Sequence, residues 1–154
     1  MAKARASDAD ATRFGGVNPI FRVGDLAASL DYYVRILGFK IEWEFTGVIA
    51  CVSRDRVGIF LSQGDQGNPG SWVWIGVGDA ERVHEELTRK GARIRQPPTN
   101  FPWALELQVL DLDGNVLRLG SEPMKDRPLG EWLDMRGDRW RRNREGSWTR
   151  VGMS

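Results

Sequence analysis

The sequence predicts an α+β fold: two tandem βαβββ modules form curved mixed sheets around a cavity, and an extra C-terminal tail follows them. Three observations predict this fold. The chain contains an internal repeat, apolar and polar residues alternate along the segments around it, and turn residues separate these segments. With 154 residues, the chain is long enough to build one domain from two such modules.

The internal repeat is marked by the motif Val-Gly-Asp, which occurs at 23–25 and returns 54 residues later at 77–79. In each copy an apolar strand ends at the aspartate, whose carboxylate can cap a helix by accepting hydrogen bonds from the first turn. Each helix then ends at a glycine, Gly38 or Gly91, a residue that adopts the left-handed conformation common after helices. Each copy is therefore a strand followed by a helix.

Three strand-like segments follow each helix. They are FKIEWEF, GVIACVSR and RVGIFLSQ in the first half, and ARIRQPP, ALELQVLD and VLRLG in the second. Turns at Arg54-Asp55 and at Asp113-Gly114-Asn115 connect the last two strands of each half. The segment GDQGNPG at 64–70 is typical of a linker.

These boundaries divide the chain into three parts. Residues 17–121 form a single domain made of modules 17–63 and 70–121, and residues 1–16 form a disordered head. Residues 122–154 form an extension. Within it, Trp132 and Leu133 start a segment that packs on the domain or on a dimer partner. The extension is rich in arginine and tryptophan, but its interspersed acidic residues argue against nucleic-acid binding.

The composition excludes several classes of protein. The net charge of +1 provides no global field for nucleic acid or an anionic membrane surface. No apolar run approaches the length of a membrane span, and the N-terminus lacks the apolar core of a signal peptide, so we expect a cytoplasmic protein. The single cysteine, Cys51, cannot form an intrachain disulfide. The seven tryptophans are the unusual feature.

Two of these tryptophans share one side of a predicted strand. In GSWVWIGVGD at 70–79, Trp72 and Trp74 point to one face, whereas Val73 and Ile75 point to the other. The helix of the second module covers the aliphatic face, so the tryptophan face needs a different partner. A ligand, a second subunit, or both would supply it.

The paired modules resemble the vicinal oxygen chelate superfamily, which includes glyoxalase I, extradiol dioxygenases, and fosfomycin- and bleomycin-resistance proteins. The resemblance rests on GDLAASLDYYVRILGF and DLDGNVLRLG and covers about residues 17–121. It implies a cavity lined by the sheet faces that are turned away from the helices. Metal enzymes of this superfamily place two histidines and a glutamate there.

The positions that correspond to those ligands by register are Asn18, Trp72 and Arg118. An amide is a weak ligand, an indole nitrogen has no free lone pair, and a guanidinium repels a metal cation. The sequence therefore predicts no metal, no other cofactor and no catalytic residue. Within the resemblance, the chain is closest to the metal-free bleomycin-resistance branch.

The same strand parity and the aromatic loop before the seventh strand predict the ligand-binding residues. They are Asn18, Arg22, Phe60, Trp72, Trp74, Trp103, Glu106 and Arg118. Flat aromatic faces with a few polar groups are typical of a small-molecule site.

The leading hypothesis is a homodimeric, metal-independent protein that binds and sequesters an aromatic drug or antibiotic. The ligand would be planar and either cationic or polar. Two alternatives stay open. One is an enzyme of the same superfamily with an atypical active site: a metal-dependent lyase or dioxygenase with unusual ligands, or a metal-free isomerase in which Glu106 would serve as a base. The other is a structural or regulatory dimer that binds no ligand.

Overall fold

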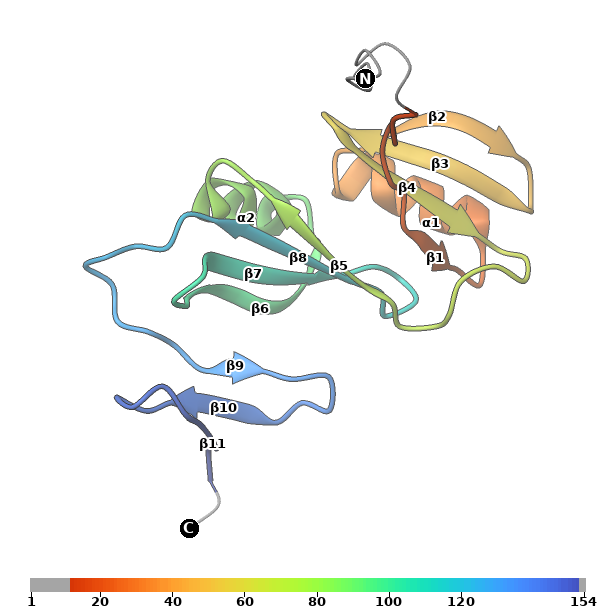
Figure 1. Ribbon diagram of the computed structural model, residues 1–154. Coiled ribbons are helices and arrows are strands. Elements are labelled where there is room, and N and C mark those ends of the chain that lie inside the picture. Colours follow the sequence, from red (N-terminus) through yellow and green to blue (C-terminus); the bar gives the residue numbers. More distant parts are fainter. Residues whose placement is uncertain (1–11, 153–154) are drawn as a thin grey trace, which may run out of the picture.

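The computed structural model describes residues 12–152, which form two βαβββ modules and a small C-terminal sheet (Figure 1). This architecture confirms the predicted α+β fold. Most of the head predicted for 1–16 lies outside the described residues, and residues 12–16 contain no helix or strand. No helix within 12–152 combines the length and the apolar character needed to cross a membrane.

The first module folds as a four-stranded mixed sheet with one helical segment. Its elements are β1 (Ile20–Arg22), α1 (Leu26–Asp31), η2 (Tyr32–Ile36), β2 (Lys40–Phe45), β3 (Ile49–Arg54) and β4 (Val57–Ser62). The strand order is β1-β4-β3-β2, with β1 parallel to β4 and the other pairs antiparallel. The β3–β4 loop is Asp55-Arg56, one residue later than predicted, because the strand pairing extends to Arg54 and Val57.

The second module repeats this arrangement. Its elements are β5 (Trp72–Gly76), α2 (Ala80–Arg89), β6 (Arg93–Asn100), β7 (Leu105–Leu110) and β8 (Val116–Ser121), in the sheet order β5-β8-β7-β6. Both predicted helix caps are present: Asp25 accepts a hydrogen bond from the Ala28 N–H, and Asp79 accepts two from the first turn of α2. Strand β6 includes two prolines and shifts register beside them, as is usual at a sheet edge.

The first helix differs from the expected regular α-helix. After α1 the chain forms a single π-helical stretch, η2, in which the Leu37 N–H donates to the carbonyl of Tyr32 at 3.1 Å. The wider turns carry Tyr32 and Tyr33 toward the second module. Their hydroxyls donate to the Leu110 carbonyl and to the Asp111 carboxylate, at 2.7 and 3.1 Å. A local pattern of spacing could not show this, because the partners lie 78 residues away.

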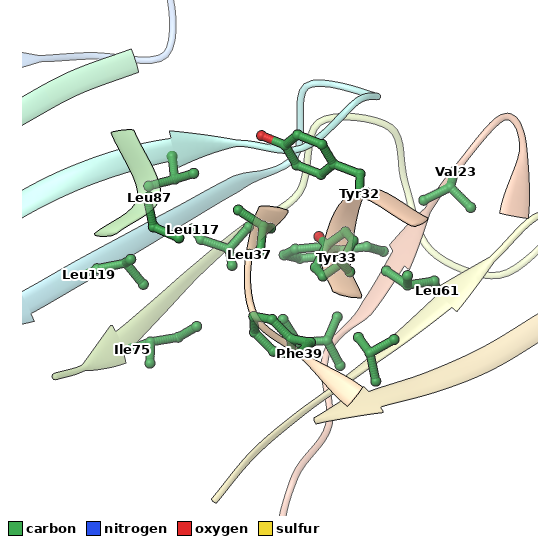
Figure 2. Close-up of a cluster of buried hydrophobic side chains, with 14 of the residues drawn as sticks. Val23, Tyr32, Tyr33, Leu37, Phe39, Leu61, Ile75, Leu87, Leu117 and Leu119 are labelled. Carbon is green, nitrogen blue, oxygen red and sulfur yellow. The ribbon is translucent and has the colours of Figure 1, made fainter. Parts of the chain in front are cut away.

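The two modules share one hydrophobic core, so they form one folded unit. Figure 2 shows side chains from both modules in this core, including Tyr33 and Leu61 of the first and Leu87 and Leu117 of the second. At the polar end of the junction, Asp111 accepts hydrogen bonds from Tyr33 and Asn115. Burial raises the pKa of the Asp111 carboxyl, and these hydrogen bonds oppose that rise.

The C-terminal extension forms a three-stranded antiparallel sheet, which the sequence patterns did not predict. Its strands are β9 (Trp132–Leu133), β10 (Arg139–Arg142) and β11 (Trp148–Arg150), in the order β11-β10-β9. Two tight turns connect them. Asp134 accepts the N–H groups of Arg136 and Asp138, and Asn143 accepts that of Ser147. Figure 1 shows this sheet beside β6, the edge strand of the second module.

Candidate functional site

The candidate site lies on the helix-free face of the second module, meaning the side of its sheet that is turned away from α2. Strand β5 alternates as its sequence predicts: Ile75 belongs to the core and Val73 packs against it, while Trp72 and Trp74 occupy the helix-free face. The Trp74 ring lies across Gly120 of β8, where an added Cβ would come within 3.0 Å of it. Glycine at 120 therefore permits the ring to turn toward the middle of the face.

The buried carboxylate of Glu106 is the centre of the helix-free face. It is 1% exposed and forms an ion pair with Arg118, with 2.6 Å between Arg118 Nε and Glu106 Oε1. The indole N–H groups of Trp74 and Trp103 donate to its other oxygen, at 3.2 and 3.1 Å. Arg118 Nη2 also reaches that oxygen, at 3.2 Å.

These contacts decide what Glu106 can do. Four donor groups surround its two oxygens, so the carboxylate orients the rings of Trp74 and Trp103 and compensates the charge of Arg118. A general base needs a lone pair that faces substrate. This geometry argues against the alternative in which Glu106 abstracts a proton, and it also makes Arg118 unavailable as a free anion-binding group.

The C-terminal extension covers the other part of this face. Arg95 lies over Trp72, with its Cζ 5.2 Å from the ring centroid, and donates to the backbone carbonyls of Leu133 and Asp134 and to the side chain of Gln108. Burial lowers the pKa of the Arg95 guanidinium. Arg95 therefore joins the sheet to strand β9.

Hydrogen bonds from side chains of β6 to backbone carbonyls hold the start of the extension. Asn100 donates to the carbonyls of Met124 and Arg127, each at 2.8 Å, and Gln96 donates to the Glu131 carbonyl at 2.7 Å. Gly130 passes against Thr99 so closely that a Cβ on it would lie 2.2 Å from the Thr99 methyl group. The absence of a side chain at 130 permits this approach.

Four tryptophans meet where the extension lies on the sheet. Trp132 packs against Trp72 and Trp103, with ring centroids 6.3 and 6.1 Å apart, and the Trp103 and Trp148 centroids are 6.0 Å apart. The guanidinium of Arg118 lies 4.8 Å from the Trp132 centroid. Trp103 itself stacks on Phe101, at 4.8 Å and an interplanar angle of 3°.

An open pocket of about 440 Å³ lies beside three of these tryptophans, Trp103, Trp132 and Trp148, and we call it the aromatic pocket. It is lined by Trp103, Arg118, Trp132, Asp134, Trp140 and Trp148. The Trp140 indole donates to Asp134 at 2.9 Å, and this hydrogen bond, with the two N–H groups of the following turn, holds the pKa of Asp134 below its ordinary value. Asp134 is thereby kept as a carboxylate at one wall of the pocket.

The structure divides the eight predicted ligand-binding residues between two places. Trp74, Trp103, Glu106 and Arg118 are joined directly by hydrogen bonds, and Trp72 joins them through Trp132. The other three lie on the first module. Their positions are Asn18 against Gly58, Arg22 on the carbonyl of Asp65, and Phe60 beside Trp43. In the part of the chain that the structure describes, no hydrogen bond, ion pair or ring contact joins these two groups.

Sequence reasoning missed Trp132, Trp140 and Trp148 as residues of this site. They belong to the extension, outside the repeat, so no register relates them to the sheet face. The available signal was their number, because three of the seven tryptophans occur within 132–148.

The residues at the three expected ligand positions have poor chemistry for a metal ion. Asn18, Trp72 and Arg118 present an amide, an indole and a guanidinium, and the Glu106 carboxylate on the second face is already paired with Arg118. Within residues 12–152, no group of three or more histidine, cysteine, aspartate or glutamate side chains lies close enough together to bind a metal ion.

The fold defines a class: proteins built from two βαβββ modules, each with a four-stranded mixed sheet. The model of the Glyoxalase/Bleomycin resistance protein/Dioxygenase superfamily matches residues 16–119, and the chain belongs to that superfamily. The match ends before the extension, so the superfamily domain accounts for Trp72, Trp74, Trp103, Glu106 and Arg118 and not for the tail tryptophans. No curated protein matches the chain.

Several solved structures share the fold at low sequence identity. The bleomycin-binding protein from Streptomyces verticillus, complexed with copper(II)-bleomycin, is 23% identical with a TM-score of 0.62, covering 72% of this chain and 98% of its own. TnmS3, an antibiotic-binding protein from Streptomyces sp. CB03234, is 23% identical with a TM-score of 0.63 and coverages of 74% and 100%. TioX from Micromonospora sp. ML1 is 20% identical, with a TM-score of 0.60 and coverages of 70% and 99%.

Proposed function

We propose that this protein binds and sequesters a planar aromatic small molecule, without a metal, in the aromatic pocket. The observation that carries the proposal is that four tryptophans line the aromatic pocket. They are Trp103, Trp132, Trp140 and Trp148, and the volume of about 440 Å³ is typical of small-molecule sites. Stacking on an indole face stabilises a flat ligand by roughly 0.5–1.5 kcal/mol per ring pair beyond area burial. The antibiotic-binding proteins of the same fold support this function.

The lining of the pocket favours a cationic ligand. Its charged groups are Arg118, which is paired with Glu106, and the carboxylate of Asp134, which also interacts electrostatically with Arg95 and Arg136. Indole faces also attract cations, with about 2 kcal/mol or more when the site is desolvated. The proposed ligand is therefore a planar aromatic cation.

A homodimer in the cytoplasm is part of the same proposal. The helix-free face of the first module exposes Trp43 and Phe45, at 41% and 68% of their surface, next to the partly buried Phe60. Exposed apolar patches of this kind mark interaction sites. A second copy that covers this face would bring the first-module residues Asn18, Arg22 and Phe60 into a shared cavity.

The test is a calorimetric titration with bleomycin and with ethidium, a planar aromatic cation, followed in parallel by tryptophan fluorescence. We expect saturable binding near one site per chain. Replacing Trp103 or Trp140 by alanine should weaken it by roughly 1–3 kcal/mol, as for central aromatic anchors at other sites. Trp72→Ala should act in the same direction, because Trp72 supports Trp132.

The matched control is Trp43→Ala, an exposed tryptophan on the face of the other module. It removes an indole without touching the aromatic pocket, so affinity per chain should stay unchanged when parent and variant are compared as monomers. A planar aromatic anion, 2-naphthoate, should bind more weakly than ethidium. Binding that survives Trp103→Ala and Trp140→Ala would contradict the proposed site, and stoichiometric tightly bound metal would contradict the metal-independent mode.

A further inference from the structure

A second cavity lies on the opposite side of the second sheet, between the two modules, and we call it the seam cavity. Its volume is about 400 Å³. The wall on the second module comes from the helix-facing side of the sheet, with Ile75, Leu117 and Leu119, and from Val83 and Leu87 of α2. The facing wall comes from the first module: Figure 2 shows Leu37 and Phe39 opposite these sheet residues.

The seam cavity is a gap in an otherwise continuous core. Protein interiors are close-packed, and voids larger than a water molecule are few in a domain. Here the module junction is filled at one end by the tyrosines of η2, whereas the other end, between the β3–β4 loop and the end of β5, is left open. Apolar side chains around such a space do not hold water well, so the space favours an apolar ligand.

The mouth of the seam cavity is polar and carries two arginines. Arg54 donates to the Leu37 carbonyl and to Glu86 of α2, both at 2.8 Å, and so ties the first module to the second across the mouth. Asp55 and Arg56 form the tight β3–β4 loop beside it. Within residues 12–152, Arg56 has no hydrogen-bond or ion-pair partner, although it lines the cavity. Guanidinium groups only donate, so the mouth suits a ligand that ends in an acceptor.

We propose that the seam cavity is a second binding site, for an amphiphilic carboxylate whose apolar chain enters between the modules and whose carboxylate meets Arg56. The floor is aliphatic and aromatic, and the arginine is the available charged donor at the mouth. This site is independent of the aromatic pocket, because the second sheet separates the two: Ile75 and Leu119 face the seam cavity, whereas Trp74 and Arg118 face the other side.

The experiment uses decanoate as the probe, with decanol as the uncharged control. In the full-length protein, decanoate at millimolar concentration should raise Tm saturably, and it should shift the NMR methyl signals of Val83, Leu87 and Leu117. The indole N–H signals of Trp103 and Trp140 should stay unchanged. Decanol should bind more weakly.

Two variants test the two ends of the site. Val83→Phe fills the cavity from α2 and should abolish the rise in Tm on adding decanoate. Arg56→Gln keeps a donor but removes the charge, and because the group is exposed we expect affinity to fall roughly fivefold. Trp132→Ala is the control on the other side of the sheet and should leave decanoate binding unchanged.

Several results would overturn the proposal. They are no saturable effect of decanoate, shifts at the tryptophans instead of the Val83 methyls, or equal affinities for decanoate and decanol. If Val83→Phe fails to fold, the methyl shifts in the unchanged protein still decide. Failure of ethidium to bind, with decanoate bound in the seam cavity, would reject only the aromatic function.

Discussion

The helix-free faces of the two modules have the same backbone positions but opposite chemistry. By strand register, Ile49 and Phe60 in the first sheet hold the places that Glu106 and Arg118 hold in the second. The second face has a buried ion pair and is covered by the extension through Trp132. The first face is mainly apolar apart from Asn18 and Arg22, and in the part of the chain that the structure describes its Trp43 and Phe45 side chains are 41% and 68% exposed.

A repeated fold can carry two different surfaces, because only one side of each sheet packs against a helix. The core-facing residues of both modules are alike in character, because both sheets pack against a helix. The residues on the helix-free side are not needed for that packing, so they are free to differ. The C-terminal extension covers the face that holds the Glu106–Arg118 ion pair, whereas the aromatic side chains Trp43 and Phe45 of the first face stay exposed.

The largest expected effect comes from giving the second face the chemistry of the first. Glu106→Ile should lower the free energy of unfolding by about 3 kcal/mol, because it leaves Arg118 without its ion partner. Adding Arg118→Phe should recover most of this loss, since the second face would then be apolar like the first. Urea denaturation of both variants measures the effect. A single variant as stable as the parent would show that the ion pair contributes no specific stability.

The next effect concerns the packing of the C-terminal extension on the second sheet. Trp132→Ala should release the extension from the sheet, at a local cost of about 2 kcal/mol, because the ring packs on Trp72, Trp103 and Arg118. Hydrogen exchange should accelerate in β9–β11 and remain slow in β7 and β8. Equal acceleration throughout the domain would mean that the extension is part of the global fold and not a separate cover.

A third variant tests the open face. Trp43→Ala should change the unfolding free energy of the single chain by less than about 1 kcal/mol, because the ring is half exposed. It should weaken self-association roughly tenfold if this face is the dimer contact. Analytical ultracentrifugation over a concentration series measures this. A chain that stays monomeric at micromolar concentration before mutation would reject the dimer.

The smallest effect is a pH dependence of the structure of the C-terminal extension around Asp134. Hydrogen bonds to its charged form lower the pKa of Asp134 from its ordinary 3.8. Asp134 therefore stabilises the extension above pH 3.8, and this stabilisation is lost as the pH falls through the folded-state pKa. The Trp140 indole N–H signal should therefore change as the pH is lowered below 3.8, the ordinary pKa of the group. Asp134→Asn should remove this transition, and a transition that persists in the variant would assign it to another group.

Much of the architecture was predictable, because its causes are local. The Val-Gly-Asp repeat, the caps at Asp25 and Asp79 and the strand parity of Trp72 and Trp74 each depend on neighbours within a few residues. The same parity placed Glu106 and Arg118 on one face. It could not show that Glu106 is saturated by donors, since Trp74 and Arg118 lie on other strands.

The sequence alone therefore determined the two modules, their core faces and the residues turned away from the helices, because backbone periodicity sets which side of a strand or helix a residue occupies. Folding in three dimensions decided which surfaces meet. The π-helical turn at Tyr32 and the position of Trp132 over the second sheet both depend on distant partners: Tyr32 bonds to Leu110, 78 residues away, and Trp132 packs on Trp72. Such contacts result from packing and hydrogen-bond satisfaction across the whole domain, and no local pattern encodes them.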